Sequence, residues 1–373
     1  MRKAISILLS IVIMMLAFTG CSGENKKAAV VQSSADTAIS AVYPVDDTVV
    51  QHSKKQALYL NSPLSSFVLY TNGKKEKSRP EPVEFTWQYN GGADTEYILR
   101  LSENENMENS VEYTSETESI SVYNLKLDTV YYWTVSAGNE TSSVSKFTTD
   151  AEAPRNLYVD GITNVRDLGG WERENGTRTK QGLIFRCGRL NESSAQTPNI
   201  EITESGKKIM LEDLGIKTEI DVRKTSDGET GAITSSPLGD SVTYYSCPME
   251  WEGNTFLDNK DELLKVFEIL SKEESYPLIF HCNIGTDRTG MIAYLVNALL
   301  GVPEDSLYRD YLYSNFGNIG GTRTLKNVEG SGYYKAVHSA EGDTLSEKTY
   351  NCLADFGVPT EQLDSIISIL SEQ

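Results

Sequence analysis

The sequence has few histidines and cysteines, and fewer basic than acidic residues. It has three histidines and five scattered cysteines, without a C-x-x-C pair, and this leaves little for a zinc site. Lysine and arginine number 34 against 53 aspartates and glutamates, so the net charge is −19. This balance argues against a nucleic-acid-binding protein, which needs a basic surface. Hydrophobic residues make up 39% of the 373 residues, enough for two or three domains of roughly 100–200 residues each.

Long hydrophobic runs are also absent, except for one short run at the N-terminus. Arg2 and Lys3 precede the apolar residues 4–17, a pattern typical of a signal peptide over residues 1–20 and too short for a comfortable transmembrane helix. The run ends in Phe-Thr-Gly before Cys21, which resembles the bacterial lipobox and implies a lipid on Cys21. We therefore expect an extracytoplasmic lipoprotein anchored to the bacterial cell membrane. An ordinary cleaved signal with an incidental cysteine is the alternative.

A linker and a β-rich module follow the signal. Residues 21–43 are mostly small and polar without periodicity, which predicts a flexible linker. Residues 44–149 contain short alternating runs of β-branched and aromatic residues, separated by Gly- and Asn-rich turns. This pattern predicts an all-β sandwich. The clearest runs are residues 83–87, 97–101, 120–123 and 130–135, whereas residues 44–79 either supply a first strand or stay irregular.

One motif in this module points to a family. The run from Leu125 to Tyr131, Leu-x-Leu-Asp-Thr-x-Tyr, resembles the fibronectin type III family over residues 80–148. The resemblance implies that the Tyr131 hydroxyl bonds to nearby backbone and that Trp87 lies in the core. The module carries no catalytic grouping, and its many carboxylates lack the ligand spacing of a calcium site. A protein partner is the binding function that remains open for it.

The second half, residues 155–373, has the pattern of an α/β domain. Strand-like runs alternate with helical ones after Pro154, which predicts a central sheet flanked by helices. The predicted strands are residues 183–186, 218–223, 244–247 and 277–280. Helices are predicted over residues 258–272 and 289–300, with a terminal helix capped by Thr360.

The stretch from Leu278 to Gly290 carries the chemistry. A buried strand ends at Cys282, five residues turn, and Arg288 opens an apolar helix. Backbone N–H groups of such a loop and the helix dipole converge on one point, which makes an anion cradle and lowers the pKa of the cysteine. The Arg288 guanidinium matches two phosphate oxygens, and Gly285 allows a strained turn.

A buried structural cysteine beside a helix cap is the alternative interpretation of Cys282. Against it, a Gly-Thr-Asp-Arg turn is an unusual continuation of a core position. Moreover, no other cysteine of the chain has an arginine six residues later. The sequence therefore favours a nucleophile and a phosphate receptor in one loop.

This loop resembles the cysteine-dependent tyrosine phosphatase superfamily, whose motif is H-C-x5-R-[ST]-G, and within it the bacterial tyrosine/dual-specificity branch. Further matches lie in order along the second half, at residues 164–170, 183–189, 220–223, 310–315 and 351–370. The resemblance implies a cysteine-dependent phosphatase fold. It also implies hydrolysis of phosphomonoesters through a phosphocysteine intermediate, without a cofactor or a metal.

The resemblance also assigns roles to single residues. Cys282 is the nucleophile and Arg288 the phosphate clamp, with Asp287 as general acid and then base; Asp221 and Asp258 are alternatives for that acid. The phosphate-binding residues are Asn283, Ile284, Gly285, Thr286, Asp287 and Arg288. The supporting residues are Thr289, which hydrogen-bonds the sulfur, His281, which orients the loop, Asp221, and Arg166 with Asp167 in a buttress or rim.

Two departures from the branch bear on the substrate. Asn283 and Thr286 are neutral, and Thr286 stands at the expected rim of the loop where the branch usually has lysine, which weakens a phosphoinositide interpretation. We therefore expect phosphotyrosine in proteins or peptides, with phosphoinositide or dual-specificity activity as the alternative. Cys187 stands where the branch usually has serine and places a second thiol near the site. An inactive phosphatase-like binding protein or adhesin is the alternative of another class.

Overall fold

The computed structural model describes residues 38–92, 95–191, 201–224 and 234–372. The predicted signal peptide, the lipidation residue Cys21 and residues 21–37 of the predicted linker lie outside this part. No helix in the described part is long and apolar enough to cross a membrane. The expectation of a lipid anchor therefore rests on the sequence.

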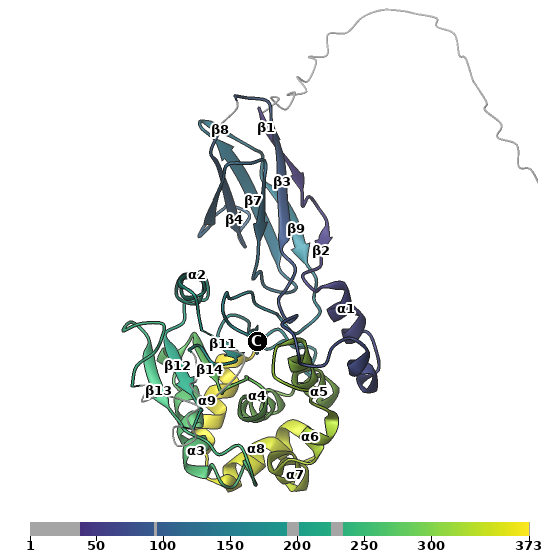
Figure 1. Cartoon of the computed structure of the whole chain (residues 1–373), viewed down its shortest axis with the longest axis vertical. Helices are drawn as coiled ribbons and strands as arrows, with labels where there is room; N and C mark the ends of the chain where they lie inside the picture. The colour runs from purple at the N-terminus through teal and green to yellow at the C-terminus, as the bar shows by residue number, and fades with distance from the viewer. Residues whose placement is uncertain (1–37, 93–94, 192–200, 225–233, 373) are drawn as a thin grey trace, which may run out of the picture. The chain divides into compact units, whose positions relative to one another are not determined.

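The first half contains two sheets around one core (Figure 1). The smaller sheet is antiparallel and has the order β1-β3-β6: Ile39–Tyr43, Val83–Tyr89 and Ser119–Val122. The larger has the order β2-β9-β7-β4-β5, with β8 paired to β7: Thr48–Val49, Ser145–Thr149, Val130–Ala137, Tyr97–Ser102, Val111–Ser115 and, for β8, Glu140–Thr141. Trp87 is buried in this core. The Tyr131 hydroxyl accepts the N–H of Lys126 at 3.0 Å, the backbone bond that the fibronectin resemblance implies.

Two segments of the first half differ from the sequence prediction. Residues 39–43, assigned to the linker, form β1, because Ile39 is fully buried and the segment pairs with β3. Residues 54–69, left undecided between strand and irregular chain, form α1 (Lys54–Leu60) and the 3-10 helix η1 (Leu64–Leu69). Tyr59 and Phe67 on these helices belong to the hydrophobic core of the second half, so this segment packs where its apolar side chains are covered.

The second half has a five-stranded sheet with β14 at its centre. The order is β10-β11-β14-β12-β13: Arg166–Asp167, Ile184–Cys187, Leu278–His281, Thr218–Asp221 and Thr243–Ser246. The last four strands run parallel, and β10 is antiparallel to β11. All four predicted strands are present with ends shifted by one or two residues. The carboxyl ends of the parallel strands meet at one edge, which is where ligands bind in such sheets.

Helices make up the rest of the second half. They are α2 (Glu204–Lys208) with the π-helix η2 (Ile209–Asp213), α3 (Lys260–Leu270), η3 (Glu273–Ser275), α4 (Asp287–Leu299), α5 (Glu304–Tyr313), η4 (Ser314–Phe316), α6 (Leu325–Glu329), α7 (Gly332–Ser339), α8 (Leu345–Phe356) and α9 (Thr360–Leu370). The three predicted helices correspond to α3, α4 and α9. Pro359, rather than Thr360, occupies the cap position of α9.

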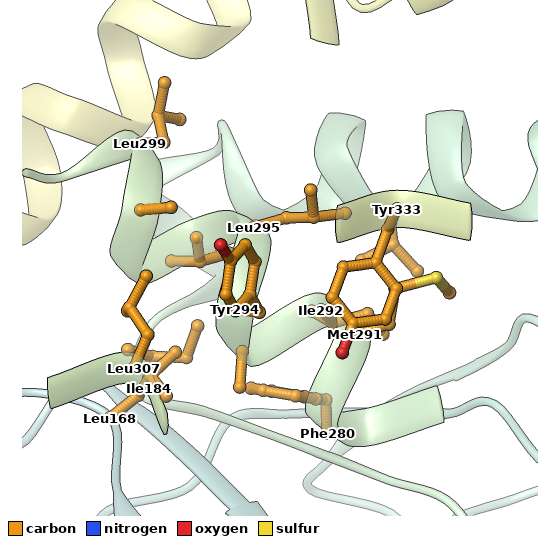
Figure 2. Close-up of a cluster of buried hydrophobic side chains, with 14 of the residues drawn as sticks. Leu168, Ile184, Phe280, Met291, Ile292, Tyr294, Leu295, Leu299, Leu307 and Tyr333 are labelled. Atoms are coloured by element: carbon orange, nitrogen blue, oxygen red, sulfur yellow. The ribbon is translucent and has the colours of Figure 1, made fainter. Parts of the chain in front are cut away.

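Helix α4 is buried on every side. All of its residues from Arg288 to Leu299 are buried, and it packs against α5 and α8. Figure 2 shows part of this packing, in which Ile184 and Phe280 of the sheet lie in one cluster with Leu295 of α4. A helix that is apolar all round is held by packing rather than by solvent. The loop between β14 and α4 is therefore fixed at both ends.

Candidate active site

Cys282 follows the last residue of the central strand β14, and the loop after it leads directly into α4. The thiol side chain is almost fully buried, with 1% of the residue exposed. Gly285 in this loop has φ of +70°, which is favourable only for glycine. A Cβ at this position would also clash with the backbone carbonyl of Cys187. The loop conformation therefore requires glycine at 285.

The carbonyl groups of the loop are held by side chains and backbone from neighbouring segments. The Asn164 amide donates to the carbonyls of Ile284 and Gly285, at 3.3 and 3.0 Å. Arg186 Nη2 also donates to the Gly285 carbonyl, at 2.8 Å, and the N–H of Arg189 donates to the Asn283 carbonyl at 3.1 Å. By contrast, the N–H groups of residues 283–286 donate to no other residue in the described part. This loop therefore leaves a run of backbone donors available for an anion.

A buried ion cluster fixes those supporting side chains. Asp310 accepts from Arg166 Nε at 2.6 Å and from Arg186 Nη1 at 2.5 Å, and Arg166 Nη1 donates to the Asn164 side chain at 2.5 Å. Burial raises the pKa of Asp310, but the two guanidinium groups outweigh it and hold the pKa below its ordinary value. Arg166 therefore supports the loop through Asn164, and Asp310 pairs with it and with Arg186.

The electrostatics of the site favour a thiolate at Cys282. Burial opposes the charged form, but the charge of Arg288 and the nearby hydroxyl and backbone N–H of Thr289 outweigh it, so the pKa of Cys282 is lowered from its ordinary value of 9.0. Arg288 is 4% exposed, and its Nη1 lies 3.2 Å from the carbonyl oxygen of Met249. Cys187 lacks this support, and burial raises its pKa well above the ordinary value. The two thiols therefore differ sharply in reactivity.

His281 is held behind the loop. Its Nε2 lies 2.9 Å from Glu219 Oε1, and its Nδ1 lies 3.4 Å from the carbonyl oxygen of Cys282. Burial lowers the pKa of His281, but Asp221 and Glu219 outweigh it and the pKa is raised. These contacts agree with the orienting role predicted for His281.

Asp221 and Asp258, the two alternatives for the general acid, lie in unlike surroundings. Asp221 is buried and accepts bonds from Arg223 and, at 3.0 Å, from the Tyr244 hydroxyl. Burial raises its pKa, but His281 and Arg223 outweigh it and the pKa is lowered, so Asp221 stays ionised and suits a structural role. Asp258 is exposed and lies beside Gly253.

Asp287 is engaged by a residue that sequence reasoning missed. Arg323 binds both of its carboxylate oxygens, each at 2.8 Å, and the Tyr311 hydroxyl donates to one of them at 3.2 Å. The Asp287 side chain is 43% exposed. Arg323 lies 36 residues further along the chain, and no local motif marks it.

Glu250 is a second carboxylate that sequence reasoning missed. It follows Met249, whose carbonyl contacts Arg288, and its side chain is 48% exposed. Lys224 pairs with it at 2.5 Å. Glu250 is therefore a half-exposed carboxylate beside Met249, which contacts Arg288, and Asp287 is a half-exposed carboxylate beside Arg288 in the chain.

Thr286 and Asp167, two further predicted site residues, are both buried. The expectation that Thr286 stands at the rim is wrong, because this residue is fully buried and its hydroxyl lies 3.4 Å from the Asn164 amide. Asp167 is also fully buried. It accepts from Arg155 at 2.8 Å and from the N–H of Gly169 at 2.8 Å, which suits a structural role in the segment behind the loop.

Comparisons with known proteins agree with this geometry. A family model described as "Tyrosine phosphatase family" matches residues 157–365. A protein from Cupriavidus necator named "Putative tyrosine-protein phosphatase" is 29% identical over 208 residues, which cover 48% of this chain and 71% of that protein. A tyrosine-protein phosphatase from Nostoc commune is 32% identical over 66 residues, 18% of this chain and 21% of that protein.

Among solved structures, the chain is similar to the core catalytic domain of the PP-IP phosphatase SIW14 from S. cerevisiae in complex with citrate, at 15% identity. The likeness covers 40% of this chain and 82% of that chain, with a TM-score of 0.28.

Proposed function

The chain belongs to the tyrosine phosphatase family, and we propose from this that it hydrolyses phosphotyrosine in proteins through a phosphocysteine intermediate. The observation that carries the proposal is the loop after β14. A cysteine with a lowered pKa lies there beside a run of backbone N–H groups, of residues 283–286, that no other described residue uses. A thiolate next to unpaired donors suits attack on a phosphoryl group, whose oxygens those donors bind.

In the first step, the Cys282 thiolate attacks phosphorus in line with the leaving oxygen. The loop N–H groups bind the equatorial oxygens, and the Arg288 guanidinium clamps two of them. The phosphorus–sulfur bond forms as the phosphorus–oxygen bond breaks, and a carboxylic acid protonates the leaving phenolate. In the second step, the same carboxylate takes a proton from the water that releases phosphate.

Asp287 remains our choice for that carboxyl group, because it is half exposed and lies in the loop itself. Arg323 occupies both of its oxygens in the free protein. We propose that this ion pair opens when substrate binds, since Arg323 is then drawn toward the phosphate and frees Asp287 for proton transfer. Glu250 is the alternative carboxyl group.

The surroundings of the site support an aromatic substrate. Cys282 is almost fully buried, so the phosphoryl group must be carried on a side chain long enough to bring it to the thiolate. Trp251 lies two residues after Met249, the residue that contacts Arg288, and is 52% exposed. Exposed indole rings pack well against phenyl rings. These features favour phosphotyrosine, while phosphoinositide or dual-specificity activity is the alternative.

We further propose that the enzyme is an extracytoplasmic lipoprotein, anchored to the bacterial membrane through Cys21. The N-terminal sequence supports this location. We also propose that the first half is a fibronectin type III-like module that binds a protein partner. Its support is the Leu125–Tyr131 motif and the hydrogen bond of Tyr131 to the backbone.

Turnover of p-nitrophenyl phosphate tests the chemistry. We expect activity in the wild type and in Cys187→Ser, and none in Cys282→Ser, which should still bind vanadate because the donors remain. Equal activity of Cys282→Ser and wild type would exclude the mechanism, and an inactive wild type would favour the binding-protein alternative. A panel of phosphotyrosine peptides, phosphoserine peptides and phosphoinositides tests the substrate, and we expect the highest kcat/KM for phosphotyrosine.

A further inference from the structure

A second cluster of ionisable side chains lies where the first half leads into the second. His52 precedes α1, and Asp150 and Glu152 follow β9. One potential ligand atom from each of the three residues lies within 4.8 Å of the others. None of the three residues belongs to the loop around Cys282. The cluster joins residues about 100 positions apart, so the sequence alone could not group them.

The hydrogen bonds of His52 determine which ring nitrogen carries hydrogen. Nε2 lies 3.0 Å from the carbonyl oxygen of Pro154, and a carbonyl can only accept, so Nε2 is the donor. In a neutral imidazole Nδ1 then holds a lone pair. Nδ1 lies 3.3 Å from Asp150 Oδ2, another acceptor. Two acceptors at this distance require a cation between them, either a proton on Nδ1 or a metal ion.

The number of carboxylates and the distances favour the metal ion. Asp150 and Glu152 bring two carboxylates to His52, and a proton on Nδ1 would engage only one of them. Glu152 makes no hydrogen bond to another residue in the described part, so its oxygens remain available. Tetrahedral zinc with bonds of about 2.1 Å places its ligand atoms roughly 3.4 Å apart. Nδ1 and Asp150 are already 3.3 Å apart, whereas Glu152 lies within 4.8 Å of both and would move closer on binding. Metal-bound histidines commonly donate their other N–H to a backbone carbonyl, as His52 does.

Two other features of the molecule bear on this choice. The Arg309 guanidinium donates to the carbonyls of Tyr59 and Ser62, at 3.3 and 3.0 Å, so it makes no hydrogen bond to Glu152, although its positive charge still acts on that carboxylate. The second carboxylate–histidine cluster, behind the Cys282 loop, has its oxygens engaged by Arg223, Tyr244 and Ser236. The His52 cluster is the one with an unused carboxylate.

We propose that His52, Asp150 and Glu152 bind a divalent metal ion of the zinc class, with water as a fourth ligand. The ion would join the segment before α1 to the segment after β9. Its role is structural, because the three ligands lie outside the Cys282 loop. This site and the phosphatase chemistry can therefore fail or succeed separately.

Zinc titration of the full-length chain, after removal of metals with a chelator, tests the proposal. We expect one saturable zinc ion per chain and a rise in Tm on binding. Glu152→Gln should weaken binding by at least about tenfold with little effect on the fold, because this side chain makes no hydrogen bond. His52→Gln should weaken it similarly. The matched control is His338→Gln, which changes a histidine that pairs with Glu304 in another part of the chain.

The results of these experiments distinguish a metal ion from a proton between His52 Nδ1 and Asp150. Saturable binding that Glu152→Gln and His52→Gln both weaken, and His338→Gln does not, supports the site. If the wild type binds zinc no better than these two variants, the cation between Nδ1 and Asp150 is a proton and the proposal is wrong. Cobalt absorption provides an independent check, because tetrahedral coordination gives a visible spectrum that the Glu152→Gln variant should lose.

Discussion

At the scale of single residues, the ionisation of Cys282 decides whether the site can act. Its pKa is lowered from 9.0 by Arg288 and Thr289 against the effect of burial. The thiolate, and therefore alkylation by iodoacetate, should rise as pH increases through this lowered pKa. We expect the pH midpoint of the alkylation rate to lie below 9 in the wild type and to be higher in Arg288→Ala. Mass spectrometry of the alkylated residue measures both. An unchanged midpoint in Arg288→Ala would mean that Arg288 does not stabilise the thiolate.

The identity of the general acid is also a question about single residues. Asp287→Asn should slow hydrolysis of phosphotyrosine by about 10²–10⁴-fold but spare substrates with very acidic leaving groups, which need no proton. Glu250→Gln is the matched variant, and we expect it to change the two substrate classes equally. The reverse pattern would assign the acid to Glu250. Plots of kcat against leaving-group pKa measure the difference.

At the scale of elements, the loop after β14 depends on a buried cluster outside it. Asp310 pairs with both Arg166 and Arg186, and Arg186 donates to the Gly285 carbonyl. Asp310→Asn leaves two buried guanidinium groups without a counter-charge, so we expect a loss of about 3 kcal/mol in stability together with lower kcat. Chemical denaturation and p-nitrophenyl phosphate turnover measure the two effects. Asp364→Asn, which removes an exposed carboxylate from α9, is the control and should change neither.

The sequence could predict features built from contiguous residues, but it could not predict those that join distant segments. The strand, loop and helix around Cys282 are contiguous, so hydrophobic pattern and motif located them within two residues. The ion pair of Arg323 with Asp287 and the cluster of His52 with Asp150 depend on folding that joins distant segments, and no spacing in the sequence marks them. The burial of Thr286 was missed for a related reason, because Asn164, which covers it, comes from another segment. The start of α1 does have a local signal, the capping box of Ser53 and Gln56, whereas the packing of Tyr59 and Phe67 on the second half depends on distant residues.

At the scale of the whole molecule, we propose an enzyme that is anchored to a membrane by a lipid. If Cys21 carries a lipid, the full-length protein should sediment with membranes, and Cys21→Ala should release it or leave its signal peptide uncleaved. Metabolic labelling with a fatty-acid analogue measures the modification directly. Labelling of Cys21→Ala equal to that of the wild type would place any lipid elsewhere. Phosphatase turnover in detergent should be the same in both, because the anchor is not part of the site.

Trapping the intermediate tests whether Cys282 forms a covalent bond to the phosphoryl group. The wild type is denatured during turnover of a phosphotyrosine peptide, and the peptide containing residues 278–290 is analysed by mass spectrometry. We predict one phosphoryl group on Cys282 in a fraction of the molecules, and none in a parallel sample of Cys282→Ser. Steady turnover with no phosphoryl group on Cys282 at any quench time, or equal turnover by Cys282→Ser, would mean that Cys282 is not the nucleophile.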